Sequence, residues 1–209
     1  MLRKIILSIS LFALMQSPSY AVGVDIALSN DSAYFKLLFN SGSFGVGGAD
    51  VGIGYYYDED GDKMATATAL ILSEAEPVGS NRNKRANNFM QYGIGVKAYM
   101  ASLAPNDETH DDRDIIDDES ASALAVGGKF RLIFPTSKPL AIAFDLFASP
   151  KITSFDDTIY FFELGARLEL EIRPDARAYV GYRYIQTKLE DYDPITIDNS
   201  PIVGMRLIF

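Results

Sequence analysis

The segment Thr158 to Ile172 alternates, residue by residue, between two kinds of side chain. A period of two places successive side chains on opposite faces of a β-strand, whereas a helix repeats every 3.6 residues. The segment therefore predicts a strand with one apolar face and one mostly charged or glycine face. The first face holds Tyr160, Phe162, Leu164, Ala166, Leu168, Leu170 and Ile172, and the second holds Phe161, Glu163, Gly165, Arg167, Glu169 and Glu171.

The same alternation recurs along most of the chain. It is clear at residues 90–100, 122–134, 140–148, 178–184 and 203–209, and weaker near 23–29, 34–39, 48–57 and 63–73. Together with 158–172 these segments predict ten strands, with eight as the alternative count. We expect an all-β fold, a single antiparallel transmembrane β-barrel. An even number of strands places both termini on one side of a membrane.

The first 21 residues predict a cleaved secretory signal peptide, followed by one barrel domain at 22–209. Arg3 and Lys4 give a positive start, Ile5 to Met15 is apolar, and Ser19-Tyr20-Ala21 offers small residues for signal peptidase. An apolar run of about eleven residues is too short for a membrane-spanning helix, which needs ~20. The absence of cysteine excludes disulfides, thiolate metal sites and thiol nucleophiles.

Alternation alone does not say which face points into a barrel. A soluble secreted barrel of the lipocalin type would turn the apolar face inward, and this is the remote alternative. Against it, the charged face is also rich in glycine, which suits a crowded lumen. Aromatic residues also gather where apolar strands end, at Tyr55-Tyr56-Tyr57 and at Tyr182 and Tyr184, as in an interfacial girdle.

The connections between the expected strands sort by charge, as an outer-membrane barrel would require. Those on the outer side hold 19 of the 28 acidic residues and three basic ones, whereas those on the inner side hold three acidic and five basic residues. Short inner turns and longer outer loops are typical of such barrels. The outer connections are expected at 30–32, 58–62, 104–120, 149–157 and 188–200, and the inner ones at 40–45, 74–88, 135–139 and 173–175.

The last residues resemble the C-terminal signal of outer-membrane barrels. Gly204, Leu207 and Phe209 occupy its positions, although Ile202 departs from the usual polar residue. An aromatic end would give the barrel-assembly machinery a hydrophobic handle on a strand edge that is still unpaired. We expect this machinery to be a partner during biogenesis.

Three segments resemble the YfaZ family of predicted outer-membrane proteins: Tyr55 to Asp62, Ala125 to Pro135 and Glu163 to Thr187. The similarity follows chain order, and its most specific parts are the sequences GAR and GYRY. It implies a barrel of about this size in the outer membrane of a Gram-negative bacterium. It brings no catalytic residues with it.

Nine charged residues on the inward face are the candidate functional site. Isolated charges are costly away from water, so they should pair with one another or contact lumen water. One interpretation is a salt-bridged plug in a narrow barrel, and the other is a constricted, charge-lined pore. The nine are Lys97, Lys129, Arg131, Asp145, Glu163, Arg167, Glu169, Arg183 and Arg206.

The acidic segment Asn106 to Glu119 carries eight carboxylates and one arginine. Oxygen ligands of this kind suit Ca²⁺ or Mg²⁺, but like-charge runs are more often solvated loops. The weak divalent-cation candidates are Asp111, Asp112, Asp114, Asp117, Asp118 and Glu119. We expect no cofactor, and the net negative charge argues against nucleic acid as a partner.

An enzyme is not expected. An outer-membrane hydrolase, the alternative, would need a positioned base, and the sole histidine, His110, lies in the acidic loop. The sequence favours an outer-membrane barrel of structural or surface-interaction type, whose acidic outer loops face cations, lipopolysaccharide or external partners. The alternative is a narrow porin-like channel for small solutes or ions.

Overall fold

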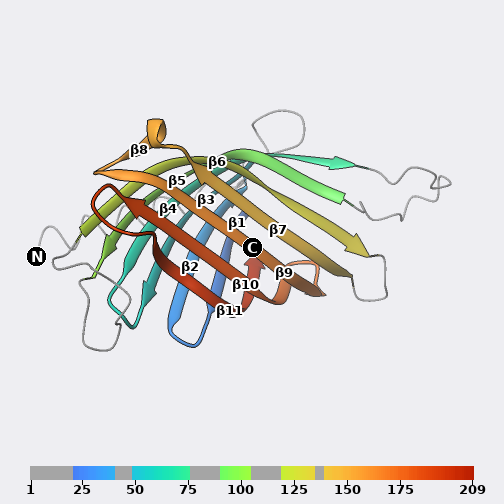
Figure 1. Ribbon diagram of the computed structural model, residues 1–209. Coiled ribbons are helices and arrows are strands. Elements are labelled where there is room, and N and C mark those ends of the chain that lie inside the picture. Colours follow the sequence, from blue (N-terminus) through green and yellow to red (C-terminus); the bar gives the residue numbers. More distant parts are fainter. Residues whose placement is uncertain (1–20, 41–48, 76–89, 105–118, 135–138) are drawn as a thin grey trace, which may run out of the picture.

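The computed structural model describes residues 21–40, 49–75, 90–104, 119–134 and 139–209, and nearly all of them are in strands (Figure 1). Ten of the strands in this part of the chain are eight residues long or longer. They are β1 (Ala21–Leu28), β2 (Ser32–Asn40), β3 (Ala49–Asp58), β4 (Lys63–Ala75), β5 (Met90–Leu103), β6 (Glu119–Phe134), β7 (Leu140–Ser149), β9 (Thr158–Arg173), β10 (Ala176–Leu189) and β11 (Ile195–Ile208).

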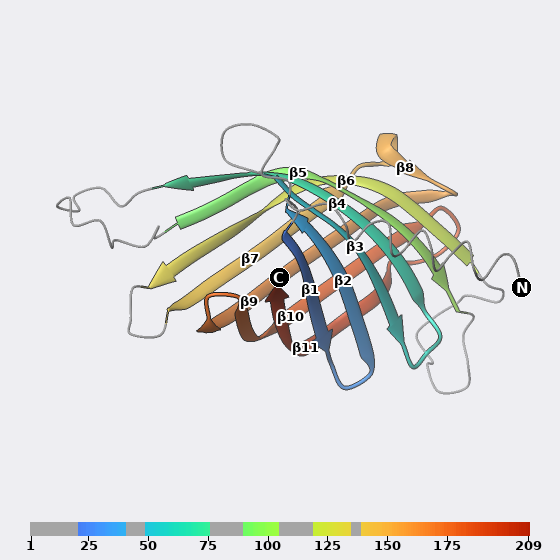
Figure 2. The same ribbon diagram turned by 180° about the vertical axis from the view of Figure 1, so that it is seen from behind.

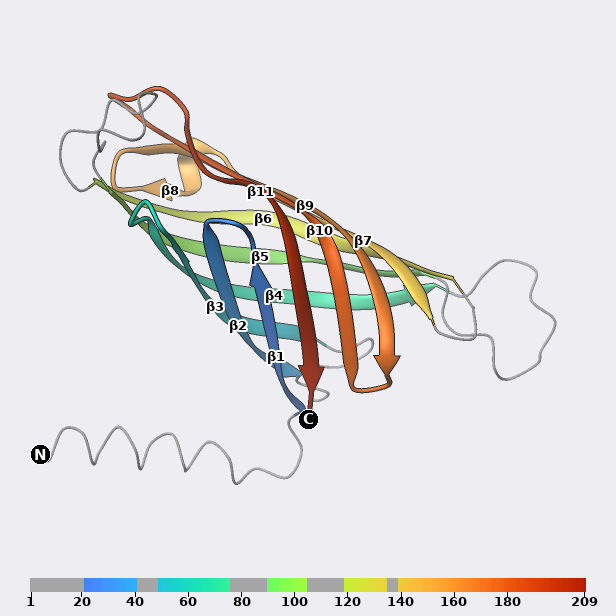
Figure 3. The same cartoon turned by 90° about the horizontal axis from the view of Figure 1, so that it is seen from below.

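These ten strands close into an antiparallel barrel. Sequential strands pair with one another, β7 pairs with β9, and the ring closes where β1 pairs with β11. Gly23 lies opposite Ile208 at this closure, so the C-terminal strand lies beside the first one (Figure 3). Figure 2 shows the opposite wall, from β1 to β6. The predicted ten-strand barrel is confirmed, and the alternative count of eight is wrong.

The predicted bounds of the last strand were wrong. β11 begins at Ile195 instead of Val203, and β10 extends to Leu189, so the connection expected at 188–200 is only 190–194. The pairing of β10 with β11 shifts register between Ile185 and Gln186. Because Ile197 and Asp198 are both buried, the bulge interrupts the alternation that sequence reasoning relied on.

The connection from β7 to β9 has structure of its own. A 3₁₀ turn, η1 (Lys151–Thr153), leads into the two-residue strand β8 (Ser154–Phe155), which pairs with β6. Asp156 and Asp157 then turn the chain with φ of 52° and 58°. Two consecutive residues with positive φ are the requirement of a type I′ hairpin turn. This segment lies at the end of the barrel opposite the start of β1 and the end of β11 (Figure 3).

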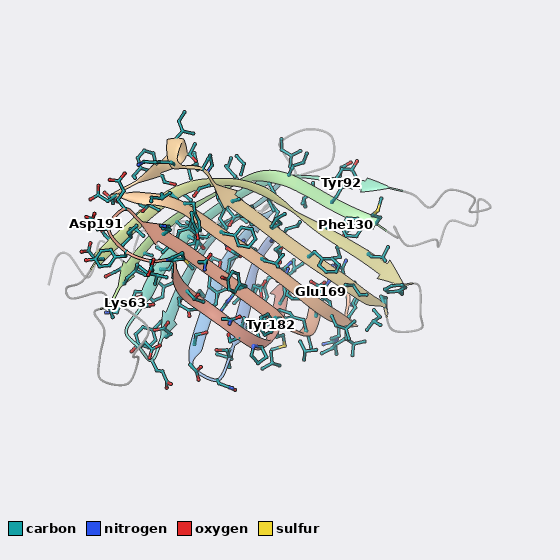
Figure 4. The ribbon with its side chains drawn as sticks, in the orientation of Figure 1. Lys63, Tyr92, Phe130, Glu169, Tyr182 and Asp191 are labelled. Atoms are coloured by element: carbon teal, nitrogen blue, oxygen red, sulfur yellow. The ribbon has the colours of Figure 1, made fainter. Side chains whose placement is uncertain are left out.

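Apolar side chains point outward from all ten barrel strands. Exposed examples include Leu28 on β1, Ile71 on β4, Val126 on β6 and Val203 on β11. Tyr182 on β10 and Phe130 on β6 belong to this outer surface, whereas Glu169 on β9 is buried (Figure 4). A soluble barrel has the opposite polarity, so the lipocalin-type interpretation is wrong and the fold is that of a transmembrane barrel.

The expected aromatic girdle needs one correction. Tyr55 and Tyr57 are exposed on the outer face of β3, but Tyr56 between them is buried in the interior. Its hydroxyl lies within hydrogen-bond distance of two acceptors, the Asp58 carboxylate at 3.2 Å and the Ile197 carbonyl at 3.0 Å. A period of two allows only alternate members of a tyrosine run to face the lipid.

Candidate functional site

The half of the barrel interior away from the termini is filled by apolar side chains. A single cluster of buried residues draws on β3 to β7 and on β9 to β11, and Tyr34 of β2 packs against it. Tyr99 of β5 and Phe161 of β9 stack at its centre, with ring centroids 4.1 Å apart. Phe161, Leu103 and Ala125 are its most buried members. This apolar layer was not predicted, because the sequence shows inward residues such as Phe161 only as isolated members of a mostly charged or glycine face.

Next to the apolar cluster, one ion pair crosses the lumen. The Lys97 ammonium on β5 lies 2.5 Å from the Glu163 carboxylate on β9. The Tyr99 hydroxyl donates to the same carboxylate oxygen at 2.6 Å. The ammonium also lies 4.9 Å from the centre of the Tyr99 ring and 5.5 Å from that of Phe147. A carboxylate that accepts hydrogen bonds from an ammonium and from a hydroxyl is satisfied without water.

Further toward the termini, Asp25 on β1 gathers cations from two other strands. Arg206 on β11 donates to it from Nε at 2.9 Å and also from Nη2. Arg167 on β9 reaches across the lumen to within 4.0 Å, and the Tyr179 hydroxyl donates at 2.6 Å. Asp25 is 3% exposed, so these partners replace the water that it has lost.

Three further close ion pairs lie in this charged half. Arg167 pairs with Asp145 on β7 at 2.7 Å, and Arg131 pairs with Glu169 at 2.7 Å. Lys129 on β6 reaches Asp50 on β3 at 3.5 Å. Since β3 and β6 are not neighbours in the barrel, this last pair also crosses the lumen.

Arg183 on β10 lies at the other end, within the apolar half. It pairs with Asp198 on β11 and donates to the Ser32 hydroxyl at 3.3 Å. Its guanidinium lies 5.3 Å from the Tyr34 ring and 5.1 Å from the Tyr56 ring. Contacts with aromatic faces help to stabilise a cation where little water is present.

The structure thus places all nine candidate charges inside the barrel and divides them into two groups. Eight form the central and terminal-side ion pairs, and Arg183 stands apart. Sequence reasoning missed their partners Asp25, Asp50 and Asp198, as well as Lys36. The alternation is weaker in the first three strands, so their charged residues were not considered. The signal that could have identified Asp25 is a single charge between apolar neighbours, in Val24-Asp25-Ile26.

Two glycines of β3 let side chains of β2 cross over that strand. The Tyr34 hydroxyl passes over Gly54 to reach the Thr66 hydroxyl at 3.0 Å, and a Cβ at Gly54 would lie 2.3 Å from it. Lys36 passes over Gly52 in the same way to reach Thr68 on β4 at 3.2 Å. The glycine-rich composition of β3 therefore makes room for two contacts between β2 and β4.

A cavity of about 50 Å³ lies among the charged residues near the middle of the barrel. Its walls include Lys36, Lys129 and Arg206, together with Asp145. The Asp145 Oδ1 and Arg167 Nε atoms have no hydrogen-bond partner within the described ranges. A polar space of this size has room for a few water-sized particles.

Among the described residues, no group of three or more potential metal ligands could hold an ion. Glu119 begins β6 and accepts a hydrogen bond from Tyr192 at 3.0 Å. The other five candidates and His110 lie outside the described residues.

The residues of the C-terminal signal lie at the barrel seam. Gly204 is opposite Ala27 on β1, Leu207 is opposite Val24, and Phe209 follows the end of β11 with its side chain exposed. Their recognition by the assembly machinery stays a prediction. The GAR and GYRY sequences lie side by side, because Gly181, Tyr182 and Arg183 pair with Arg167, Ala166 and Gly165.

No family model and no curated protein match the chain. The resemblance to the YfaZ family is therefore not confirmed. Two solved chains are similar in structure, one described as a KdgM porin and the other as a KdgM porin in complex with disordered oligogalacturonate. Each is 10% identical to this chain, with a TM-score of 0.43, and the alignment covers 90% of this chain and 99% of the porin. We draw no functional inference from a similarity this low.

Among the described segments, no helix has the length and apolar character needed to cross a membrane.

Proposed function

We propose that this protein is a β-barrel of the Gram-negative outer membrane whose lumen is closed, and that it acts through its outer surface rather than by conducting solutes. Apolar side chains on every barrel strand form the lipid-facing belt that such a location requires. The acidic outer loops would meet divalent cations, the lipopolysaccharide leaflet or an external partner. Membership of the YfaZ family is part of this proposal.

The observation that carries the closed state is the apolar cluster centred on Tyr99 and Phe161. Its members come from eight of the ten long strands described, so it extends across the lumen instead of lining one wall. Apolar side chains in contact leave no continuous path for water, and an ion cannot cross such a layer without losing its hydration shell. A barrel of ten strands is also close in size to those that side chains can fill.

The alternative, a narrow porin-like channel, is favoured by the other half of the lumen. That half is polar, contains the cavity and is lined by both signs of charge. If the apolar cluster moved aside, these residues would line the ion path. We therefore regard a channel as the second candidate function.

Single-channel conductance in a planar bilayer tests the closed state. We expect no discrete steps from the folded wild-type protein. The double variant Tyr99→Ala with Phe161→Ala removes the stacked pair and should give steps. The matched control is Tyr92→Ala with Phe130→Ala, because these residues are an adjacent tyrosine and phenylalanine on the outer face (Figure 4).

Reproducible steps from the wild-type protein would contradict the closed state and favour the narrow channel. The ion selectivity of those steps would then show whether Arg131 and Arg167 line the path. Recovery of the wild-type protein from the soluble periplasm, instead of the detergent-resistant outer membrane, would contradict the membrane location itself.

A further inference from the structure

Lys36 on β2 is a buried cation that pairs with no carboxylate of the described ranges. Its side chain is inside the barrel and the residue is 5% exposed. Among the described residues no carboxylate lies within 4.0 Å of its ammonium, which donates one hydrogen bond, to the Thr68 hydroxyl at 3.2 Å. An ammonium has three donors, so two of them have no acceptor within the part of the protein that the structure describes.

Residues of the two neighbouring strands β3 and β4 fix the position of this ammonium. The side chain crosses β3 over Gly52, where an added Cβ would lie 2.3 Å from Lys36 Cε. Any larger residue at that position would displace it from the cavity wall. Gly52 and Thr68 therefore hold the ammonium where it borders the cavity.

The other cations of the cavity wall each have a carboxylate of their own. The pairs are Lys97 with Glu163, Lys129 with Asp50, Arg167 with Asp145 and Arg206 with Asp25. The wall itself holds five cations, Lys36 included, and three carboxylates, and Asp50 beyond the wall is the partner of Lys129. One positive charge is left over, and it is that of Lys36.

We propose that the cavity binds one small monovalent anion of about the size of a halide, held by Lys36. An unpaired charge is costly in a low-dielectric interior, and an anion would satisfy both the charge and the free donors. A cavity of about 50 Å³ admits such an ion but excludes organic anions of sugar size. The neighbouring Lys129, 3.5 Å from Asp50, adds to the positive potential on this wall.

This inference does not depend on whether the lumen conducts. An anion can occupy the cavity in a closed barrel, and a conducting barrel could lack the site. The conductance experiment therefore tests the closed lumen and the binding experiment tests the anion site, and a negative result in one leaves the other proposal standing.

Bromide is the probe, compared with gluconate at equal ionic strength because gluconate is too large for the cavity. The urea midpoint of the folded barrel, measured by the gel mobility of unheated samples, should rise with bromide concentration in the wild-type protein. Lys36→Met should abolish the rise, because methionine keeps the length of the side chain and removes the charge. Lys63→Met, at an exposed lysine on β4, is the matched control and should keep it.

Thr68→Val supplies a variant that keeps the lysine. It removes the protein acceptor, so the rise in midpoint should persist and become larger than in the wild-type protein. In crystals grown with bromide, the anomalous signal should show one site within hydrogen-bond distance of Lys36 Nζ, and none in Lys36→Met.

The proposal is overturned by the absence of any difference between bromide and gluconate in the wild-type protein. An equal rise in Lys36→Met, or an empty cavity in the anomalous map at saturating bromide, would overturn it as well. In either case Lys36 would be buried without a bound anion.

Discussion

Lys97 and Glu163 meet across the lumen with Nζ and Oε2 2.5 Å apart, although 66 positions separate them in the chain. Both side chains are nearly inaccessible to water. Removing one member leaves a buried charge without its partner, whereas removing both leaves none. We expect Lys97→Met and Glu163→Gln each to lower the free energy of unfolding by about 3–5 kcal/mol.

The double variant should recover most of that loss, because the two positions are directly coupled. Urea unfolding in lipid vesicles measures all four proteins of the cycle. Single variants that each cost less than about 1 kcal/mol, with costs that add in the double variant, would show that the pair is solvated rather than buried.

Val126 and Ile152 are both exposed, at 59% and 89%, but only Val126 lies in the apolar belt. Val126 is near the middle of β6, and Ile152 is in η1 at the end of the barrel away from the termini. An arginine at the bilayer midplane of a barrel costs about 2–4 kcal/mol. We expect Val126→Arg to lower stability in vesicles by this amount and Ile152→Arg to change it little. Equal effects of the two variants would contradict a membrane-embedded belt.

Gly54→Val should destabilise the barrel even though valine favours strands. The added side chain would collide with the Tyr34 hydroxyl and the Thr66 hydroxyl, both of which are fixed by their hydrogen bond. Overpacking of this kind costs about 1–3 kcal/mol. Ala67→Val is the control, because Ala67 faces outward on the neighbouring strand β4. The urea midpoint of each variant is measured from the fraction of folded protein on unheated gels. An unchanged midpoint for Gly54→Val would show that the barrel loses no stability when Tyr34 can no longer pass over residue 54.

Asp157→Gly should stabilise the turn between β8 and β9. Asp157 has φ of 58°, a conformation that costs a residue with a Cβ about 1 kcal/mol relative to glycine. Asp156 has similar backbone geometry, but its carboxylate accepts a hydrogen bond from the Ser122 hydroxyl. Asp156→Gly should therefore gain less. Amide hydrogen exchange of Ser154 and Phe155 reports the difference, and faster exchange in Asp157→Gly would contradict the expected gain.

The barrel itself could be predicted from the chain because the relevant signals are local. The pleat of a strand alternates its faces whatever the strand pairs with, so the run from Thr158 to Ile172 specifies both a strand and its two faces. The wrong prediction of where β11 begins also has a local cause. The bulge beside Gln186 brings Ile197 and Asp198 inside together, which hid Ile195 to Ile202, more than half of β11, from a search for strict alternation.

Residue by residue, the sequence alone determined the number of strands and which face of each turns toward the lumen, since both follow from side-chain periodicity and from polarity. Only the tertiary structure decided which inward side chains meet. Closing the barrel sets the tilt and stagger of its strands, and these determine that Lys97 reaches Glu163 and that Tyr99 stacks on Phe161. The same geometry leaves Lys36 with Thr68 as its hydrogen-bond partner and no carboxylate nearby among the described residues, a consequence of the order β2, β3, β4 in the barrel wall that no local pattern carries.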